Sequence, residues 1–295
     1  MKTPDSGRIR SSLRDALLES RSHDGTWPYV SGKQGRLEPT CWALLALGRA
    51  DGRGPDLEAL KGWRRRDNWL IDVDGAPPNQ AFNGFAGVTC LAQPHGRDLI
   101  APLAARVIEA KGARFPSSDV IRLDASLQAW SWVDGTASWV EPTAWCLLFL
   151  KKYVKFAPAP VATERISVGE RLLLDRACVD GGWNYGNTKV FGKDLWPYVP
   201  TTALALMAMQ DRRMEPVIQQ SLAQLEKDVA SERSMSALAL TIICLRVFGI
   251  PQGQVQRDLY ALVERNQTQW RDNLLGVAMA LYALEPGQGA DAFAL

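Results

Sequence analysis

The chain has 295 residues, 46% of them hydrophobic, and its 34 basic and 32 acidic side chains leave a net charge of only +2. This balance gives no electrostatic case for binding nucleic acid or an anionic membrane. No apolar run approaches the roughly 20 residues that span a bilayer, and the first 15 residues have no apolar signal region, so we expect a soluble protein without a transmembrane segment.

Two kinds of helix alternate along the chain. Amphipathic helices are expected at 8–20, 57–66, 98–111, 163–178, 215–229 and 254–266, and nearly uncharged apolar helices at 38–50, 84–93, 141–151, 200–210, 234–247 and 273–284. A helix that is apolar all round is buried, whereas a one-faced helix covers it from outside. Six outer–inner helix hairpins predict an all-α (α/α)6 toroid, forming a single domain over residues 1–295. No strand of useful length is expected.

A short phrase recurs at the start of three inner helices. Its copies are Glu38-Pro39-Thr40, Glu141-Pro142-Thr143 and Val199-Pro200-Thr201, and each follows a loop rich in Gly, Trp and Asp. Proline is tolerated in the first turn because its missing N–H would have no intrahelical partner there. Such recurrence indicates a repeat architecture, so we expect the three phrases at equivalent positions on one rim of the toroid.

Long loops precede the inner helices of the first four modules, at 21–37, 67–83, 112–140 and 179–199. Long loops gathered at one face usually carry the functional site. Trp27 and Trp183 belong to the repeated loop motif, so the default expectation is that they tie loops to neighbouring helices. Trp42 and Trp145 share one repeat position and face either a cavity or the core. The basic run 61–66 is expected to be a solvated helix face.

The five cysteines are odd in number, widely spaced and without a CxxC pair, which indicates a reducing compartment and hence a cytoplasmic protein. Only two histidines occur, His23 and His95. We therefore expect no metal site, structural zinc included, and no cofactor.

The stretch Asp180-Gly181-Gly182-Trp183, leading to Pro200-Thr201-Thr202-Ala203, resembles the repeats of the terpenoid cyclase and protein prenyltransferase superfamily, which includes squalene–hopene cyclases. The resemblance covers residues 8–284. It implies a toroid whose central cavity takes an isoprenoid or similar apolar ligand, and which either acts alone or pairs with a partner subunit. Glu141 stands where class II cyclases carry the middle Asp of their DxDD acid motif, but both flanking Asp residues are missing. Neither a DDxxD motif nor the prenyltransferase zinc ligands are matched.

The first interpretation is accordingly an enzyme of terpenoid cyclase or prenyltransferase type, with cyclisation of an isoprenoid started by protonation. Candidate acids are Glu141, Asp134 and Asp180. Candidate substrate-binding residues, whose aromatic faces would stabilise a cation, are Trp42, Trp139, Trp145, Trp183, Tyr185, Trp196 and Tyr198.

Two other functions stay open. One is a non-catalytic toroid that binds a lipid, a peptide or a protein. The other is a carbohydrate-active (α/α)6 enzyme with Asp134 and Glu141 as its carboxylate pair. Glu38 shares the repeat position of Glu141, which favours a structural role for both in closing the loop. A deep apolar cavity with one acid would favour the cyclase, a shallow cleft with two facing acids would favour glycans, and a filled centre would favour a scaffold.

Overall fold

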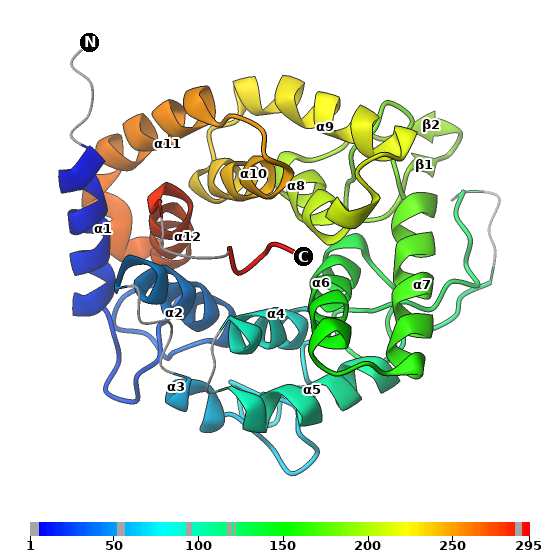
Figure 1. Cartoon of the computed structure of the whole chain (residues 1–295), viewed down its shortest axis with the longest axis horizontal. Helices are drawn as coiled ribbons and strands as arrows, with labels where there is room; N and C mark the ends of the chain where they lie inside the picture. The colour runs from blue at the N-terminus through cyan, green and yellow to red at the C-terminus, as the bar shows by residue number, and fades with distance from the viewer. Residues whose placement is uncertain (1–5, 52–56, 93–95, 117–119, 121, 287–290) are drawn as a thin grey trace.

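The helices form an inner and an outer ring in the computed structural model (Figure 1), which describes all residues except 1–5, 52–56, 93–95, 117–119, 121 and 287–290. The inner helices are α2 (Leu37–Asp51), α4 (Gln80–Leu91), α6 (Val140–Phe156), α8 (Val199–Ala208), α10 (Met235–Phe248) and α12 (Leu274–Leu284). The outer helices are α1 (Ser6–Glu19), α3 (Glu58–Lys61), α5 (Arg97–Glu109), α7 (Pro160–Asp175), α9 (Pro216–Asp228) and α11 (Gly253–Arg265). Because α12 packs against α2, the ring closes, and the predicted (α/α)6 toroid is confirmed.

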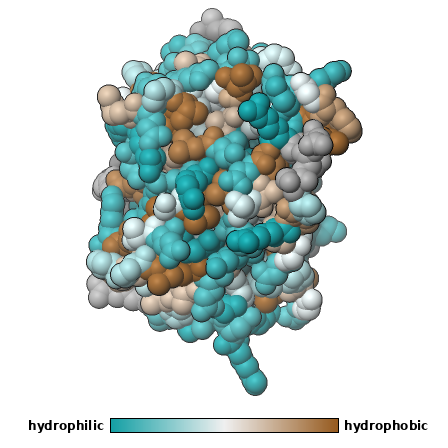
Figure 2. Space-filling model, turned by 90° about the vertical axis from the view of Figure 1, so that its right-hand side faces the viewer, coloured by the Kyte–Doolittle hydropathy of each residue, from teal (hydrophilic) through white to brown (hydrophobic). Residues whose placement is uncertain are grey.

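Burial follows the two kinds of helix. The inner helices are buried on nearly every side, and glycines let two of them approach closely. A Cβ at Gly84 would lie 2.8 Å from the backbone nitrogen of Cys146, and one at Gly87 would lie 2.5 Å from the Phe149 ring. The outer side is polar, and Figure 2, which views the side carrying α7, shows hydrophobic residues in separate patches among hydrophilic ones. Within the described residues, no helix combines the length and hydrophobicity needed to cross a membrane.

The loop tryptophans tie each loop to the outer helix before it. Three indole N–H groups donate to helix carbonyls at 2.7 Å, from Trp27 to Leu17, from Trp130 to Val107 and from Trp183 to Leu173. All three tryptophans are almost completely buried. The expected structural role of Trp27 and Trp183 is therefore what the structure shows.

The same loops fix the register of the inner helices. In three of them the fourth residue is a threonine whose hydroxyl accepts the backbone N–H of the loop tryptophan, namely Thr40 (2.9 Å), Thr143 (3.4 Å) and Thr202 (2.9 Å). The prediction that the recurring phrases share one rim is confirmed. The alignment of the third copy was wrong by one residue, because Thr202 rather than Thr201 makes the contact. Pro200 therefore stands where α2 and α6 carry Glu38 and Glu141.

Each long loop also caps the inner helix of the preceding module. The first N–H of the helix is donated to the next loop, from Leu37 to Asp72 Oδ2 (2.7 Å), from Gln80 to the Trp132 carbonyl (2.9 Å), from Val140 to the Tyr185 carbonyl (3.1 Å) and from Leu274 to the Tyr29 carbonyl (2.9 Å). The first N–H groups of a helix have no intrahelical partner, so these contacts satisfy them. The contact of Leu274 joins the last helix to the first loop and ties the ring closed.

Two segments differ from the sequence expectation. The outer helix expected at 57–66 is only the four-residue α3, because the chain turns back at Gly62, Asn68 takes a positive φ of 71°, and Arg64 forms a β-bridge with Leu70. The basic run is therefore a turn and a bridged loop rather than a helix face. A hairpin of β1 (Lys189–Val190) and β2 (Lys193–Asp194) was also missed, because two-residue strands carry no alternating pattern.

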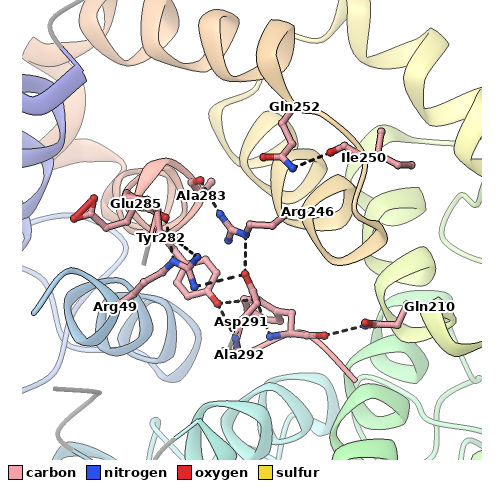
Figure 3. Close-up of polar contacts among 12 residues, drawn as sticks. Arg49, Gln210, Arg246, Ile250, Gln252, Tyr282, Ala283, Glu285, Asp291 and Ala292 are labelled. Carbon is pink, nitrogen blue, oxygen red and sulfur yellow. Dashed lines mark hydrogen bonds and ion pairs between the residues drawn. The ribbon is translucent and has the colours of Figure 1, made fainter. Parts of the chain in front are cut away.

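Residues 291–295 lie in the centre of the toroid (Figure 1), where Asp291 contacts the last turns of α10 and α12. Asp291 accepts hydrogen bonds from Arg246 Nε at 2.7 Å and the Tyr282 hydroxyl at 2.8 Å (Figure 3). Phe293 is fully buried. Its ring centroid lies between 5.2 and 6.3 Å from those of Trp42, Phe85, Trp145 and Tyr282. This end of the toroid is thus filled by the chain itself.

Candidate functional site

The stripe of each inner helix that faces the toroid axis can be located from its aromatic residues. Trp42, Phe85 and Trp145 are the sixth residues of α2, α4 and α6, and their rings meet in the centre, with centroids 4.9 Å apart for Trp42 and Phe85 and 4.4 Å for Phe85 and Trp145. Residues four positions apart share a helix face. The second residues of these helices, Glu38, Ala81 and Glu141, therefore lie above this aromatic floor on the loop-bearing side.

Two carboxyl groups accordingly converge at the loop-rich mouth. Glu38 and Glu141 come from α2 and α6, and the small side chain of Ala81 lies on α4 between them. Both glutamates are half-buried. They are near enough that the negative charge of Glu38 raises the pKa of Glu141. The arrangement is a pair of acids over apolar rings, at the face where the long loops gather.

Glu141 has a strongly raised pKa. Burial, followed by the charge of Glu38, raises its pKa from 4.5 to about 7, against a smaller opposing contribution from a hydrogen bond with the Trp145 side chain. Desolvation disfavours the carboxylate, while a hydrogen-bond donor favours it. Burial thus outweighs the helix N-terminus, which by itself would stabilise the anion. Glu141 can hold a proton near neutral pH.

Glu38 has a dedicated hydrogen-bond donor. The Tyr29 hydroxyl donates to Glu38 Oε2 at 2.7 Å. Burial raises the pKa of Glu38 above its ordinary value, and the Tyr29 hydrogen bond offsets part of that rise. Burial and the Glu38 carboxylate together raise the pKa of Tyr29, so the phenol stays a donor. The carboxylate of Glu38 thus accepts a phenol O–H, whereas the hydrogen bond of Glu141 comes from the Trp145 side chain.

The sequence analysis gave Glu38 a structural role and did not name it among the candidate acids, whereas the structure brings it close to Glu141. The signal was present, since equal repeat positions on the inner helices of a closed ring must face the same axis. A recurring glutamate there places two acids in one mouth.

The other candidate acids are more exposed than this pair. Asp134 is exposed and accepts a hydrogen bond at 2.7 Å from Nε2 of Gln80. Asp180 is exposed beside Gly181, which packs against α9. Neither residue shares the environment of Glu141.

The candidate aromatic residues divide into three groups. Trp42 and Trp145 form the buried floor, so their faces contact other rings. Trp183 is buried against α7, where its indole N–H donates to the Leu173 carbonyl, and Trp139 is half-buried at the start of α6. Only Tyr185, Trp196 and Tyr198 are exposed, and they line one groove of about 560 Å³.

The next feature is the distribution of the side chains that commonly bind metals. Within the described part of the chain, no three His, Cys, Asp or Glu side chains converge in a way that could hold a metal ion. All five cysteines are free and buried. His23 is exposed, and His95 lies outside the described residues.

Comparisons with known proteins show the fold rather than a family. No family model matches the chain, and no curated protein sequence matches it. An α-1,6-mannanase from Salegentibacter sp. matches with a TM-score of 0.63 and 11% identity, over 95% of this chain and 98% of that one; inactive variants of it were solved with α-1,6-mannotriose and α-1,6-mannotetrose. An α-amylase from Clostridium perfringens (TM-score 0.62, 8% identity, 94% and 97% covered) and a protein from Actinoplanes (0.61, 16%, 95% and 98%) also match.

These neighbours contradict the resemblance to terpenoid cyclases and prenyltransferases, and with it the isoprenoid ligand. The loop–helix phrase that carried the resemblance consists of packing residues, a buried tryptophan and a helix threonine. Such residues specify a toroid and not its chemistry. The apolar centre that would have held an isoprenoid is occupied by Trp42, Trp145 and Phe293.

Proposed function

We propose that this protein is a carbohydrate-active enzyme that hydrolyses glycosidic bonds of a neutral glycan, with Glu38 and Glu141 as its carboxyl pair. The observation that carries the proposal is the convergence of these two acids at the mouth, one with a pKa near 7. The solved structures of similar fold, which include an α-1,6-mannanase and an α-amylase, support the same class of substrate.

Glycoside hydrolysis needs one protonated and one ionised carboxyl group. Glu141 has its pKa raised to about 7 and is suited to donate a proton to the glycosidic oxygen as the bond to the anomeric carbon breaks. Glu38, whose anion is stabilised by the Tyr29 hydroxyl, is suited to act as the carboxylate, either on the anomeric carbon or on the attacking water. The two carboxylates repel each other when both are ionised. The ionised form of Glu38 therefore helps Glu141 to keep its proton.

The test measures the release of reducing sugar from α-1,6-mannan and from starch by the full-length protein. Glu141→Gln and Glu38→Gln should each lower the rate by about 10²-fold or more, because acid–base catalysis contributes on this scale. Asp134→Asn, which removes the carboxylate first suggested as the partner of Glu141, should leave the rate within about twofold. Release of no sugar by the wild type, or equal rates in both glutamine variants and the wild type, would contradict the proposal.

The filled centre favours a second candidate, a toroid that binds a glycan without cleaving it. Phe293 and the rings around it leave the acids at a mouth above a closed floor. Binding of α-1,6-mannotetrose by the wild type with no release of sugar over a long incubation would select this candidate.

A cytoplasmic location is also part of the proposal. Five free, buried thiols are compatible with a reducing compartment. Fractionation of source cells followed by immunodetection tests it, and recovery of the protein outside the cytoplasmic fraction would contradict it.

A further inference from the structure

We propose that Tyr185, Trp196 and Tyr198 form a platform that binds a neutral oligosaccharide chain as it leads away from the carboxyl pair. The inference rests on the proposed function for the identity of its ligand, and it adds where the chain runs and what holds it. The three side chains lie in the loop before α8 and remain 59%, 72% and 46% exposed.

The platform is held rigidly by backbone and amide contacts beneath it. Asn184 is buried, and its Oδ1 accepts the backbone N–H of Gly186 at 2.9 Å, while its Nδ2 donates to the Asn187 carbonyl at 2.8 Å. The Tyr198 N–H donates to the Trp183 carbonyl at 2.9 Å. Exposed aromatic rings on a fixed backbone lose little conformational entropy when a ligand binds, which favours binding.

The rings form one surface rather than three separate ones. The centroids of Tyr185 and Tyr198 lie 5.0 Å apart, with their planes inclined by 50°. Trp196 lines the same groove of about 560 Å³. This volume falls in the range of small-molecule sites. A pyranose ring presents a face of C–H groups that packs against an aromatic ring and an edge of hydroxyls that needs polar partners.

The end of α9 and the turn after it form a polar part of the groove wall. This wall contains Gln224, Lys227, Asp228, Ser231 and Glu232. Gln224 Nε2 holds both carboxylate oxygens of Asp228 at 2.9 Å, which fixes acceptors along the wall. One cation stands against two carboxylates, so the wall disfavours anionic ligands such as uronate chains and phosphates. Hydroxyl groups of an uncharged sugar suit this lining.

The groove lies beside the N-terminal ends of two inner helices, α6 and α8. Pro200 lines the groove and is also the second residue of α8, the position that Glu38 and Glu141 occupy on α2 and α6. On the other side, the Tyr185 carbonyl accepts the N–H of Val140, the residue before Glu141. A chain cleaved at the two acids would therefore continue over Pro200 onto the rings.

The test measures binding by isothermal titration with α-1,6-mannotetrose and maltotetraose, in full-length protein carrying Glu141→Gln so that the sugar is not cleaved. Added Trp196→Ala or Tyr185→Ala should weaken binding of the better probe by about tenfold, as expected for loss of a large aromatic contact. Phe191→Ala is the matched control, because Phe191 is 77% exposed in the same segment but does not line the groove. It should bind like the parent, and tetragalacturonate should bind more weakly than the neutral probes.

Parental affinity in both groove variants would overturn the platform, as would tight binding of tetragalacturonate or failure of both neutral probes to bind. These results are separable from the hydrolysis assay. If the groove variants weaken binding but the wild type releases no sugar, the platform is supported and only the proposed hydrolysis is refuted. If sugar release depends on Glu141 but Trp196→Ala leaves binding unchanged, the hydrolysis is supported and the platform is refuted.

Discussion

Replacement of Glu141 by glutamine should stabilise the protein at alkaline pH. The folded state holds the Glu141 proton with a pKa of about 7, against 4.5 as the ordinary value, so the folded protein binds this proton more tightly than the unfolded chain does. The resulting stabilisation is complete below pH 4.5 and is lost as the pH rises through about 7. At about 1.4 kcal/mol per pKa unit, the wild type carries a penalty of roughly 3 kcal/mol at pH 8. Glutamine, which never ionises, avoids it.

Thermal unfolding at pH 4 and pH 8 measures this effect. With an unfolding entropy of about 2.1 cal/mol/K per residue, roughly 3 kcal/mol corresponds to about 5 °C in a chain of this length. Glu141→Gln should thus melt about 5 °C above the wild type at pH 8 and within about 1 °C of it at pH 4. Asp180→Asn, at an exposed position, should follow the wild type at both pH values. Superimposable melting curves for Glu141→Gln and wild type at pH 8 would refute the desolvation of this carboxylate and its assignment as the acid.

Three further changes test the architecture around the site. Phe293→Ala removes a fully buried ring and should cost about 3–5 kcal/mol in urea denaturation; a loss below about 1 kcal/mol would show that the centre is not packed as described. Tyr29→Phe removes the donor to Glu38, so the pKa of that carboxyl should rise and the acidic limb of the rate profile should move to higher pH, whereas an unmoved limb would count against Glu38 as the working carboxylate. Trp183→Phe leaves the Leu173 carbonyl without its indole donor and should cost about 1–3 kcal/mol, with sugar release unchanged at 25 °C; loss of activity in a stably folded variant would contradict its purely structural role.

Much of the fold could be predicted because its signals are local. The alternation of apolar and amphipathic segments located eleven of the twelve helices of the two rings to within a few residues. It failed at α3, which ends early in a turn at Gly62. The structural role of Trp27 and Trp183 could be predicted because both belong to the repeated loop motif. The third phrase was misaligned because its proline is followed directly by Thr201, as the prolines of the other two copies are followed by Thr40 and Thr143. In the structure, however, Thr202 makes the hydrogen bond that corresponds to those of Thr40 and Thr143.

The site was harder to predict because it depends on contacts between distant segments. Glu38 and Glu141 are about a hundred residues apart, and only closure of the ring places them in one mouth. The burial that raises the pKa of Glu141 is likewise a property of the packed floor. Residues 291–295 carry no helical pattern, so nothing local in them indicated that Phe293 fills the centre. The family resemblance, finally, rested on packing residues and could not report on chemistry.

The inserted residues 291–295 leave the toroid a single mouth. A ring open at both ends could enclose a polymer and keep hold of it between successive cuts by threading. Here Phe293 stops the passage, and Asp291 is anchored to Arg246 and Tyr282 from the closed end. In the proposed function, a long glycan would lie across this mouth without passing through the ring, which rules out processive cleavage by threading. Each fragment would leave by the side from which the glycan arrived.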